Sequence, residues 1–342
     1  MTQKIIISID CMGGDNAPEA NIKGISIFLS STSEVSFFLY GDENRLLPII
    51  KKYPNLKGRY EIFHTDEFIK PCEKPSVALK KGKNSSMRLA IDSVKAQKSN
   101  AIVSSGNTGA LMAIAKIVLR SLPAVDRPAI VTYIPNQKNN GTILLDMGAN
   151  VNCSSEILYQ FAVMGHSFAK VVLNKQNPTI GVLNIGSEDM KGIDSVRDAA
   201  ELIRGSHLSD SFHGYVEGDD ITKGTVDVVV ADGFLGNIVL KSIEGTAKLF
   251  LSIVKESFAR SIFSKIGYLF AKKSLKKSLL AIEPKKYNGA MLIGLNGVVV
   301  KSHGSADGEA FANAINVAHS LVKNGVNKKI MDQMEIASFF EN

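Results

Sequence analysis

The residue types in this sequence that could do chemistry are short runs of Gly, Asn, Ser and Asp that follow apolar segments. In residues 226–240, the β-branched run 226–231 precedes a stretch that contains Gly233 and Gly236, and a helical pattern begins at Ile238. This order predicts a strand buried on both faces of a parallel sheet, then a glycine-rich turn, then a helix. The same order recurs in residues 9–18, 103–109, 145–152 and 183–188.

Turns of this kind suit the binding of an anion. In open α/β sheets, ligands bind at the carboxyl ends of the strands, where free N–H groups at helix N-termini attract negative charge. Five such turns at one edge of a sheet would form an anion-binding floor, and we expect the functional residues there.

Several other chemistries require motifs that the sequence lacks. It has no Walker A loop, no Gly-x-Gly-x-x-Gly fingerprint, no Gly-x-Ser-x-Gly nucleophile elbow and no His-Glu-x-x-His motif. Its three cysteines and six histidines are not spaced as metal ligands, so we expect no metal site. The polar turns can bind and orient an anion, but they offer no obvious covalent nucleophile.

The apolar periodicity predicts an α/β fold around a mostly parallel sheet. Strand patterns cover residues 5–9, 35–40, 60–63, 101–104, 130–134, 142–145, 179–185, 212–217, 226–231 and part of 289–301. Helical patterns cover residues 19–29, 77–97 with an interruption at 80–84, 110–119, 155–172, 196–203 and 309–322. The 342 residues can bury one large core or two moderate ones, and we expect a single catalytic domain. No apolar run could cross a bilayer and no signal peptide precedes the first strand, which predicts a cytoplasmic protein.

Residues 245–287 differ from the rest and predict a helical amphipathic insertion. Nine Lys or Arg residues against two Glu lie between Lys255 and Lys286, while the whole chain carries a net charge of +7. The basicity therefore belongs to one segment, and a nucleic-acid surface is not expected. Apolar and basic residues at helical spacing fit a helix in a membrane interface, although an ordinary surface helix would show a similar pattern. The residues expected to dock on a membrane or carrier are Phe258, Arg260, Ile262, Phe263, Lys265, Ile266, Leu269, Lys272, Lys273, Lys276 and Lys277.

Considered together and in order, the polar turns resemble those of a known family. The matching segments are residues 10–18, 105–112, 126–129, 146–150, 183–188, 232–237, 294–297 and 301–305. They resemble the phosphate acyltransferases of bacterial phospholipid synthesis, the PlsX family. The resemblance implies transfer of a long acyl chain from acyl carrier protein to inorganic phosphate, giving acyl phosphate. It also implies a homodimer of three-layer α/β/α Rossmann-like sandwiches related to phosphotransacetylases, no metal or organic cofactor, and light attachment to an anionic membrane surface.

That chemistry assigns roles to particular residues. Phosphate must be held and aimed at a thioester carbonyl while negative charge grows on the carbonyl oxygen. We expect Lys191 to stabilise this charge, Asn184 and Asn237 to donate hydrogen bonds, and Asp232 to orient a neighbour or handle a proton. The residues expected to bind phosphate or substrate are Asp10, Gly13, Gly14, Asp15, Gly106, Asn107, Thr108, Asp146, Gly148, Asn150, Gly186, Glu188, Gly233, Gly236 and His303.

Two other functions stay open from the sequence. One is a phosphotransacetylase that acts on a small acyl-coenzyme A, although a short acyl group needs no basic amphipathic segment. The other is a non-catalytic module that docks carrier protein or membrane. The sequence also departs from the family pattern at Tyr215, where Asn is usual, and at Asp219, where a basic residue is usual.

Overall fold

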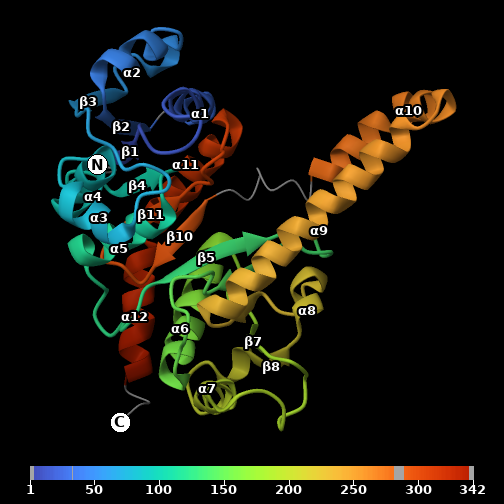
Figure 1. Cartoon of the computed structure of the whole chain (residues 1–342). Coiled ribbons are helices and arrows are strands. Elements are labelled where there is room, and N and C mark those ends of the chain that lie inside the picture. The colour runs from blue at the N-terminus through green and yellow to red at the C-terminus, as the bar shows by residue number, and fades with distance from the viewer. Residues whose placement is uncertain (1–3, 33, 281–288, 339–342) are drawn as a thin grey trace.

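The protein folds around a single mixed β-sheet (Figure 1). The computed structural model describes residues 4–32, 34–280 and 289–338. Within these residues, eleven strands form the sheet in the order β3-β2-β1-β4-β11-β10-β5-β6-β9-β7-β8. The strands are β1 (Ile5–Asp10), β2 (Val35–Gly41), β3 (Tyr60–His64), β4 (Ala101–Ser104), β5 (Ala129–Ile134), β6 (Thr142–Leu145), β7 (Ile180–Leu183), β8 (Phe212–Val216), β9 (Val228–Val230), β10 (Ala290–Ile293) and β11 (Val298–Lys301).

Helices cover both faces of the sheet. They are α1 (Glu19–Leu29), α2 (Glu43–Ile50), α3 (Pro75–Lys81), α4 (Ser86–Lys95), α5 (Thr108–Leu119), α6 (Ser155–Val172), α7 (Asp194–Arg204), α8 (Gly218–Lys223), α9 (Gly233–Ala259), α10 (Ile262–Leu280), α11 (Gly308–Lys323) and α12 (Val326–Ser338), with short 3₁₀ turns at Pro54–Leu56 and Ser209–Ser211. Alternate residues of each strand point to opposite faces. On β6, Ile143 and Leu145 therefore join the core under α1, α2, α6, α7, α11 and α12, whereas Leu144 joins the core under α3, α4, α5, α8 and α9. The predicted three-layer α/β/α sandwich is confirmed.

The strand directions divide the sheet into two halves. Parallel pairing joins β3, β2, β1, β4 and β11 in one half, and β6, β9, β7 and β8 in the other. Three antiparallel pairings, β11 with β10, β10 with β5, and β5 with β6, separate the halves. An odd number of reversals means that the two halves run in opposite directions. The expectation of five turns at one edge is therefore wrong: two of them lie at one edge of the sheet and three at the other.

Most predicted elements have the expected extents, and the exceptions have local causes. The interruption expected at residues 80–84 divides the helical segment 77–97 into α3 and α4, with Gly82 at the end of α3 and the Ser85 hydroxyl capping α4. Helix α12, which packs against α6, was not predicted and begins directly after Gly325, whose φ of +62° suits glycine.

Helix α9 begins five residues earlier than expected. Residues 232–237, predicted as a turn before a helix at Ile238, form the N-cap and first turns of α9. The Asp232 carboxylate accepts a hydrogen bond from the Leu235 N–H at 2.8 Å, as an N-cap residue does. The two glycines of this segment serve close packing, described below, and do not form a flexible turn.

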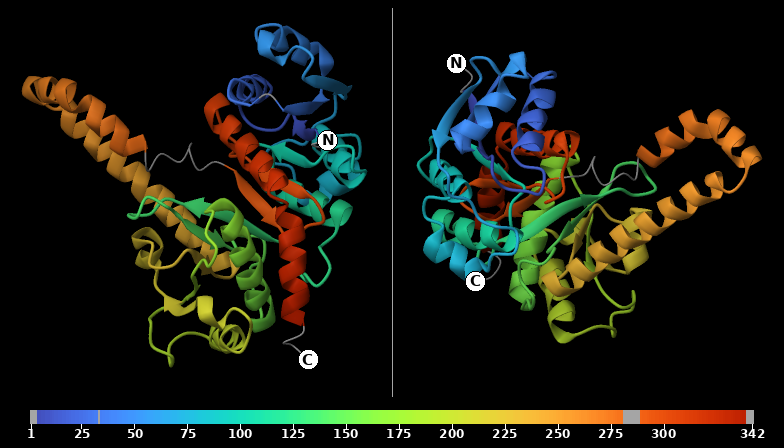
Figure 2. Two further views of the ribbon diagram at one scale, coloured as in Figure 1. Left: turned by 180° about the vertical axis from the view of Figure 1, so that it is seen from behind. Right: turned by 45° about the horizontal axis from the view of Figure 1, so that its top comes forward.

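Helices α9 and α10 form an antiparallel pair that projects from the body of the protein, as Figures 1 and 2 both show. The predicted continuous apolar face is divided, because α9 ends at Ala259 and the Ser261 hydroxyl accepts a hydrogen bond from the Ser264 N–H where α10 starts. Phe258 therefore belongs to α9, where its ring packs against Tyr268 of α10 at 5.3 Å. Phe263 and Leu269 are 86% and 71% exposed. The side chains of Ile262, Lys276 and Lys277 lie outside the described part of the chain. Among the described residues, no helix combines the length and hydropathy needed to span a membrane.

Candidate active site

The first group of predicted residues lies where β1, β4 and β11 end. Strand register places Asp10 beside Ser104, and Ser104 beside Lys301. Asp10 is buried, and its two carboxylate oxygens accept hydrogen bonds of 2.6 Å from the hydroxyls of Ser86 and Ser104. Burial raises the pKa of Asp10, and these hydrogen bonds partly offset that rise. Asp10 is 1% exposed and does not line the cavity described below, so it supports the floor of the site.

Glycines lie close to this carboxylate because no side chain would fit. A Cβ at Gly13 would lie 2.4 Å from Asp10 Oδ2, and one at Gly106 would lie 3.2 Å from the same atom. Gly14 adopts a φ of +106°, a conformation that side-chain-bearing residues rarely adopt. The loops after β1 and β4 can therefore approach each other and present backbone groups to the space above.

That space is a cavity of about 340 Å³ at the N-terminus of α5. It is lined by Met12, Gly14, Asp15, Phe68, Ile69, Pro71, Ser105, Gly106, Asn107, Thr108, Gly109, Lys301 and Gly304. Five of the predicted phosphate-binding residues, Gly14, Asp15, Gly106, Asn107 and Thr108, thus surround one cavity. Backbone N–H groups at a helix N-terminus favour an anion at such a position.

Asn107 organises the cavity through hydrogen bonds of its own. Its side-chain oxygen accepts from the Ala110 N–H at 3.0 Å and so caps α5. Its amide group donates to the carbonyl oxygens of Pro71 and Glu73 at 2.8 and 2.9 Å. Asn107 therefore ties the loop of residues 66–73 to the rim of the cavity, and its side chain is a positioning group.

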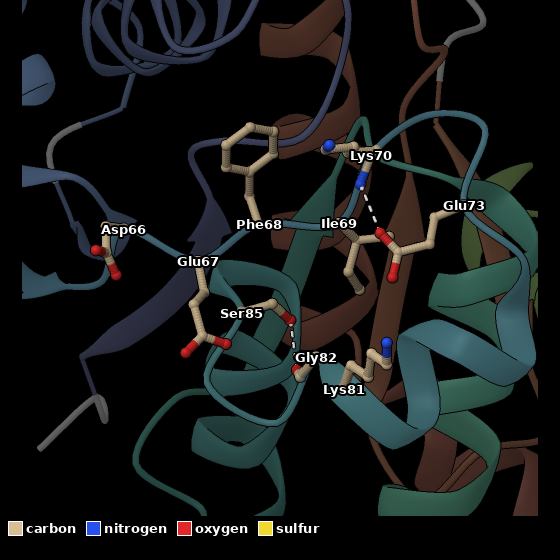
Figure 3. Close-up of a pocket in the computed structure, with 9 residues that line it drawn as sticks. All are labelled: Asp66, Glu67, Phe68, Ile69, Lys70, Glu73, Lys81, Gly82 and Ser85. Atoms are coloured by element: carbon tan, nitrogen blue, oxygen red, sulfur yellow. Dashed lines mark hydrogen bonds between the residues drawn. The ribbon is translucent and has the colours of Figure 1, made fainter.

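The same loop separates this cavity from a second pocket of about 280 Å³ (Figure 3). Phe68 and Ile69 line both, and in Figure 3 their side chains point to opposite sides of the loop. The second pocket adds charged groups of both signs, from Asp66, Glu67, Lys70, Glu73 and Lys81. The first cavity, in contrast, has a polar floor and an apolar wall, and the wall is made by Met12, Phe68, Ile69 and Pro71.

Two further residues of this group come from the end of β11. Lys301 lines the cavity and was missed as a site residue, because one lysine after the apolar run 298–300 reads as the end of a strand. His303, which was predicted, places Nδ1 2.9 Å from the Ser305 hydroxyl and is exposed, and partial burial followed by the nearby Lys301 charge lowers the pKa of its imidazole. The charges of Glu244 and Lys241 on α9 also act on His303.

The second group lies where β6 and β9 end, around a buried carboxylate. Asp146 accepts hydrogen bonds from the N–H groups of Ile130, Ala149 and Asn150 and from the Asn150 side-chain amide, at 2.7–3.1 Å. Burial raises the pKa of Asp146. Asn150 also donates to the Pro128 carbonyl oxygen at 2.8 Å. The side chains of Asp146 and Asn150 thus hold the loop after β6 in place through these hydrogen bonds.

Close packing also accounts for the glycines beside them. A Cβ at Gly233 would lie 2.8 Å from Asp146 Oδ2, and one at Gly236 would lie 2.0 Å from the Asp146 carbonyl oxygen. Gly148, with a φ of +112°, faces the side chain of Asn237, which is itself exposed. The first turn of α9 is therefore held tightly against the loop after β6, with the Asn237 side chain left at the surface.

The predicted cation Lys191 lies in the loop after β7. Asn184 directly follows β7, and its backbone N–H donates to the Val216 carbonyl oxygen of β8 at 2.9 Å. Asn184 donates to the Lys191 carbonyl oxygen at 3.0 Å and so holds this loop. Lys191 Nζ lies 2.9 Å from Glu188 Oε1, and this contact raises the pKa of Lys191 and lowers that of Glu188. A Cβ at Gly186 would strike the Lys191 side chain, so the exposed Glu188–Lys191 pair packs over the buried Gly186.

The structure therefore brings the predicted residues together in two groups at opposite edges of the sheet. The first group consists of Asp10, Gly13, Gly14, Asp15, Gly106, Asn107, Thr108 and His303. The second group consists of Asp146, Gly148, Asn150, Asn184, Gly186, Glu188, Lys191, Asp232, Gly233, Gly236 and Asn237. Helix α9 links them, because it begins in the second group and its Lys241 and Glu244 act electrostatically on His303 in the first.

The two departures from the family pattern have local partners. The Tyr215 ring lies 5.8 Å from the Arg204 guanidinium and is mostly buried, and Asp219 forms an ion pair with Lys223 one turn further along α8. These contacts explain both residues without a ligand.

Comparison with known proteins places this geometry in a family. Residues 5–329 match the model of a family described as fatty acid synthesis protein. The chain is 48% identical over 335 residues to a phosphate acyltransferase of Paramagnetospirillum magneticum, covering 98% of this chain and 95% of the relative. A phosphate acyltransferase of Rhodospirillum centenum is 49% identical over 334 residues, covering 98% and 94%. The chain belongs to the phosphate acyltransferase family.

As a member of the phosphate acyltransferase family, the protein is an acyltransferase. Its fold is similar to that of a phosphotransacetylase from Streptococcus pyogenes, with a TM-score of 0.62 at 16% identity over 95% of both chains. The phosphotransacetylase-like fold that the sequence predicted is confirmed.

Proposed function

We propose that this acyltransferase moves a long-chain acyl group from acyl carrier protein to inorganic phosphate, producing acyl phosphate for phospholipid synthesis. The observation that carries the proposal is the cavity at the N-terminus of α5, which combines backbone donors and a lysine with an apolar wall. The relatives of the chain are named phosphate acyltransferases, which agrees with this arrangement.

The proposed reaction needs no covalent intermediate on the protein. An oxygen of hydrogen phosphate attacks the thioester carbonyl carbon, a C–O bond forms and the C–S bond breaks. The proton that phosphate gives up ends on the carrier thiolate, so the products are acyl phosphate and a free thiol. The protein supplies position and charge stabilisation, and no cofactor takes part.

The proposal is tested with purified protein, palmitoyl–acyl carrier protein and inorganic phosphate, with hydroxylamine to trap acyl phosphate as the hydroxamate. We expect hydroxamate only when phosphate is present. Acetyl-coenzyme A in place of the carrier thioester tests the phosphotransacetylase alternative, and we expect far less product with it. No hydroxamate from a folded protein with either donor would refute the proposal.

We propose further that the enzyme is a cytoplasmic homodimer that attaches peripherally to anionic membranes through the α9–α10 pair. The exposed apolar side chains of α10 and the adjacent lysines support this role, because such a surface suits the boundary between headgroups and acyl chains. The acidic carrier protein is the alternative partner for the same basic surface.

Replacing Phe263 and Leu269 together with Gln separates these partners. We expect the variant to lose binding to anionic vesicles in a flotation assay and to retain its activity with soluble substrates. Ile117→Gln, at an apolar position on α5 that is 60% exposed, is the matched control and should leave vesicle binding unchanged. Lost activity with retained vesicle binding would instead assign the surface to the carrier protein.

A further inference from the structure

Lys301 lines the cavity and has no role so far in the proposed reaction. It ends β11, and its half-buried side chain enters the cavity beside the loop after β4. Its ammonium group donates to the carbonyl oxygens of Ser105, at 3.4 Å, and Ser302. Among the residues that the structure describes, no carboxylate lies within 4.0 Å of Lys301 Nζ.

An ammonium group placed like this lacks a counterion. Burial of a charge is costly unless the charge is paired, and burial lowers the pKa of Lys301 to about 8. Asp10 and Asp15 act in the opposite direction from a greater distance, and the Asp10 oxygens already accept from Ser86 and Ser104. An anion in the cavity would supply the missing partner and raise the pKa again.

Ser105 gives a second, independent indication of a ligand. The residue is 3% exposed and lines the same cavity, and its hydroxyl has no hydrogen-bond partner among the described residues. Buried hydroxyls nearly always have a partner, so an unpaired one at a cavity wall points to a bound group. Gly14 packs directly on it, since a Cβ there would lie 2.7 Å from Ser105 Cβ.

The remaining lining groups define the chemistry of that ligand. The N-terminus of the twelve-residue helix α5 and the Lys301 ammonium both favour negative charge. Asp15, in contrast, places a carboxylate at the same cavity. A carboxylate can accept a hydrogen bond from hydrogen phosphate, which carries a proton, but it can only repel sulfate, which carries none.

We infer that Lys301 binds the tetrahedral oxyanion of hydrogen phosphate in this cavity, with the Ser105 hydroxyl as a second donor and Asp15 selecting phosphate over sulfate. This inference rests on the proposed function, since it names the residues that hold the nucleophile of that reaction. The same chemistry would fit a phosphodiester in the arm of a thioester donor. The kinetic test separates these two sources.

The test replaces Lys301 with Gln, which keeps an N–H donor for the two carbonyl oxygens and removes the charge. Calorimetric titration of the whole protein with inorganic phosphate should show binding weakened by about tenfold or more, because a charge-assisted hydrogen bond is lost. In the acyl-transfer assay, the KM for phosphate should rise by a similar factor while the KM for the thioester donor stays the same. Sulfate should compete poorly with phosphate in the wild type and better in Asp15→Asn.

Two further variants keep the inference falsifiable. Lys98→Met, at an exposed lysine before the opposite end of β4, should leave phosphate binding unchanged. Ser105→Ala removes a hydroxyl with no protein partner, so it should fold normally and weaken phosphate binding several-fold. Unchanged phosphate affinity in both Lys301→Gln and Ser105→Ala would overturn the inference, as would a rise confined to the KM for the donor. If the wild type forms no acyl phosphate, the proposed function fails, but the calorimetric comparison still tests Lys301.

Discussion

Replacing Lys191 with Ala is expected to lower kcat by about a hundredfold or more without unfolding the protein. Removing a preorganised group that stabilises a developing oxyanion typically lowers kcat by a factor of about 10²–10³. The Lys191 side chain is 48% exposed, and its ion pair is with Glu188 in the same loop, so its loss should not disturb the core. Steady-state kinetics and thermal unfolding of the purified variant measure the two effects separately.

Lys223→Ala is the matched control for this experiment. Lys223 is also exposed and also forms an ion pair with an acid one turn away, Asp219, but it has no proposed role in catalysis. We expect the control to keep wild-type turnover. Near-normal turnover in Lys191→Ala would remove Lys191 from the mechanism.

The kinetic pattern also shows whether both edges of the sheet contribute to one reaction. Lys191 lies in the second group and the cavity with Lys301 in the first, and α9 runs from one toward the other. If Lys191→Ala lowers kcat and Lys301→Gln raises the KM for phosphate, the reaction draws on both groups. If only one variant has an effect, the chemistry belongs to that edge.

Much of the fold could be predicted because the local signals agree with the tertiary structure. Helices such as Glu19–Leu29 and Ser155–Val172 have the predicted bounds, and the apolar strand runs lie in the sheet. Strand direction could not be predicted in the same way. It depends on β10 and β5, two strands of ordinary apolar sequence whose antiparallel pairing is a long-range event. The repeated strand–turn–helix pattern therefore predicted that all five turns lie at one edge of the sheet, whereas they lie at two.

The site could be predicted by residue type more reliably than by role. Asp10, Asp146 and Asn107 follow strands in glycine-rich segments, as an anion-binding residue would, yet hydrogen bonds within the protein occupy their side chains. Lys301 lies in the family-like segment 301–305, but no role could be assigned to it, because its surroundings depend on burial and on neighbours almost two hundred residues away in sequence. The contacts between distant segments of the chain show whether such a residue supports the fold or binds a ligand.

Gly236→Ala is expected to destabilise the protein severely, because close packing and not backbone flexibility requires glycine there. The added Cβ would lie 2.0 Å from the Asp146 carbonyl oxygen, a backbone atom fixed by the loop after β6. Overpacking typically costs about 1–3 kcal/mol of unfolding free energy, and a collision with backbone should reach about 3 kcal/mol or exceed it. Urea denaturation of the variant and wild type measures the difference.

Gly245→Ala, on the same helix, makes the comparison specific. Nothing lies within 4 Å of a Cβ at Gly245, and the residue is exposed in the middle of α9. Alanine there should stabilise the helix by about 0.5–1 kcal/mol, because it loses less conformational entropy on folding. Changes of opposite sign in the unfolding free energy of the two variants would locate the constraint in the contact between α9 and the loop after β6.

That contact fixes Asp232 and Asn237 at the start of α9, so Gly236→Ala should also lower acyl-transfer activity in whatever fraction remains folded. Equal stability of the two variants would show that the loop after β6 can move aside, and the glycine would then need another explanation.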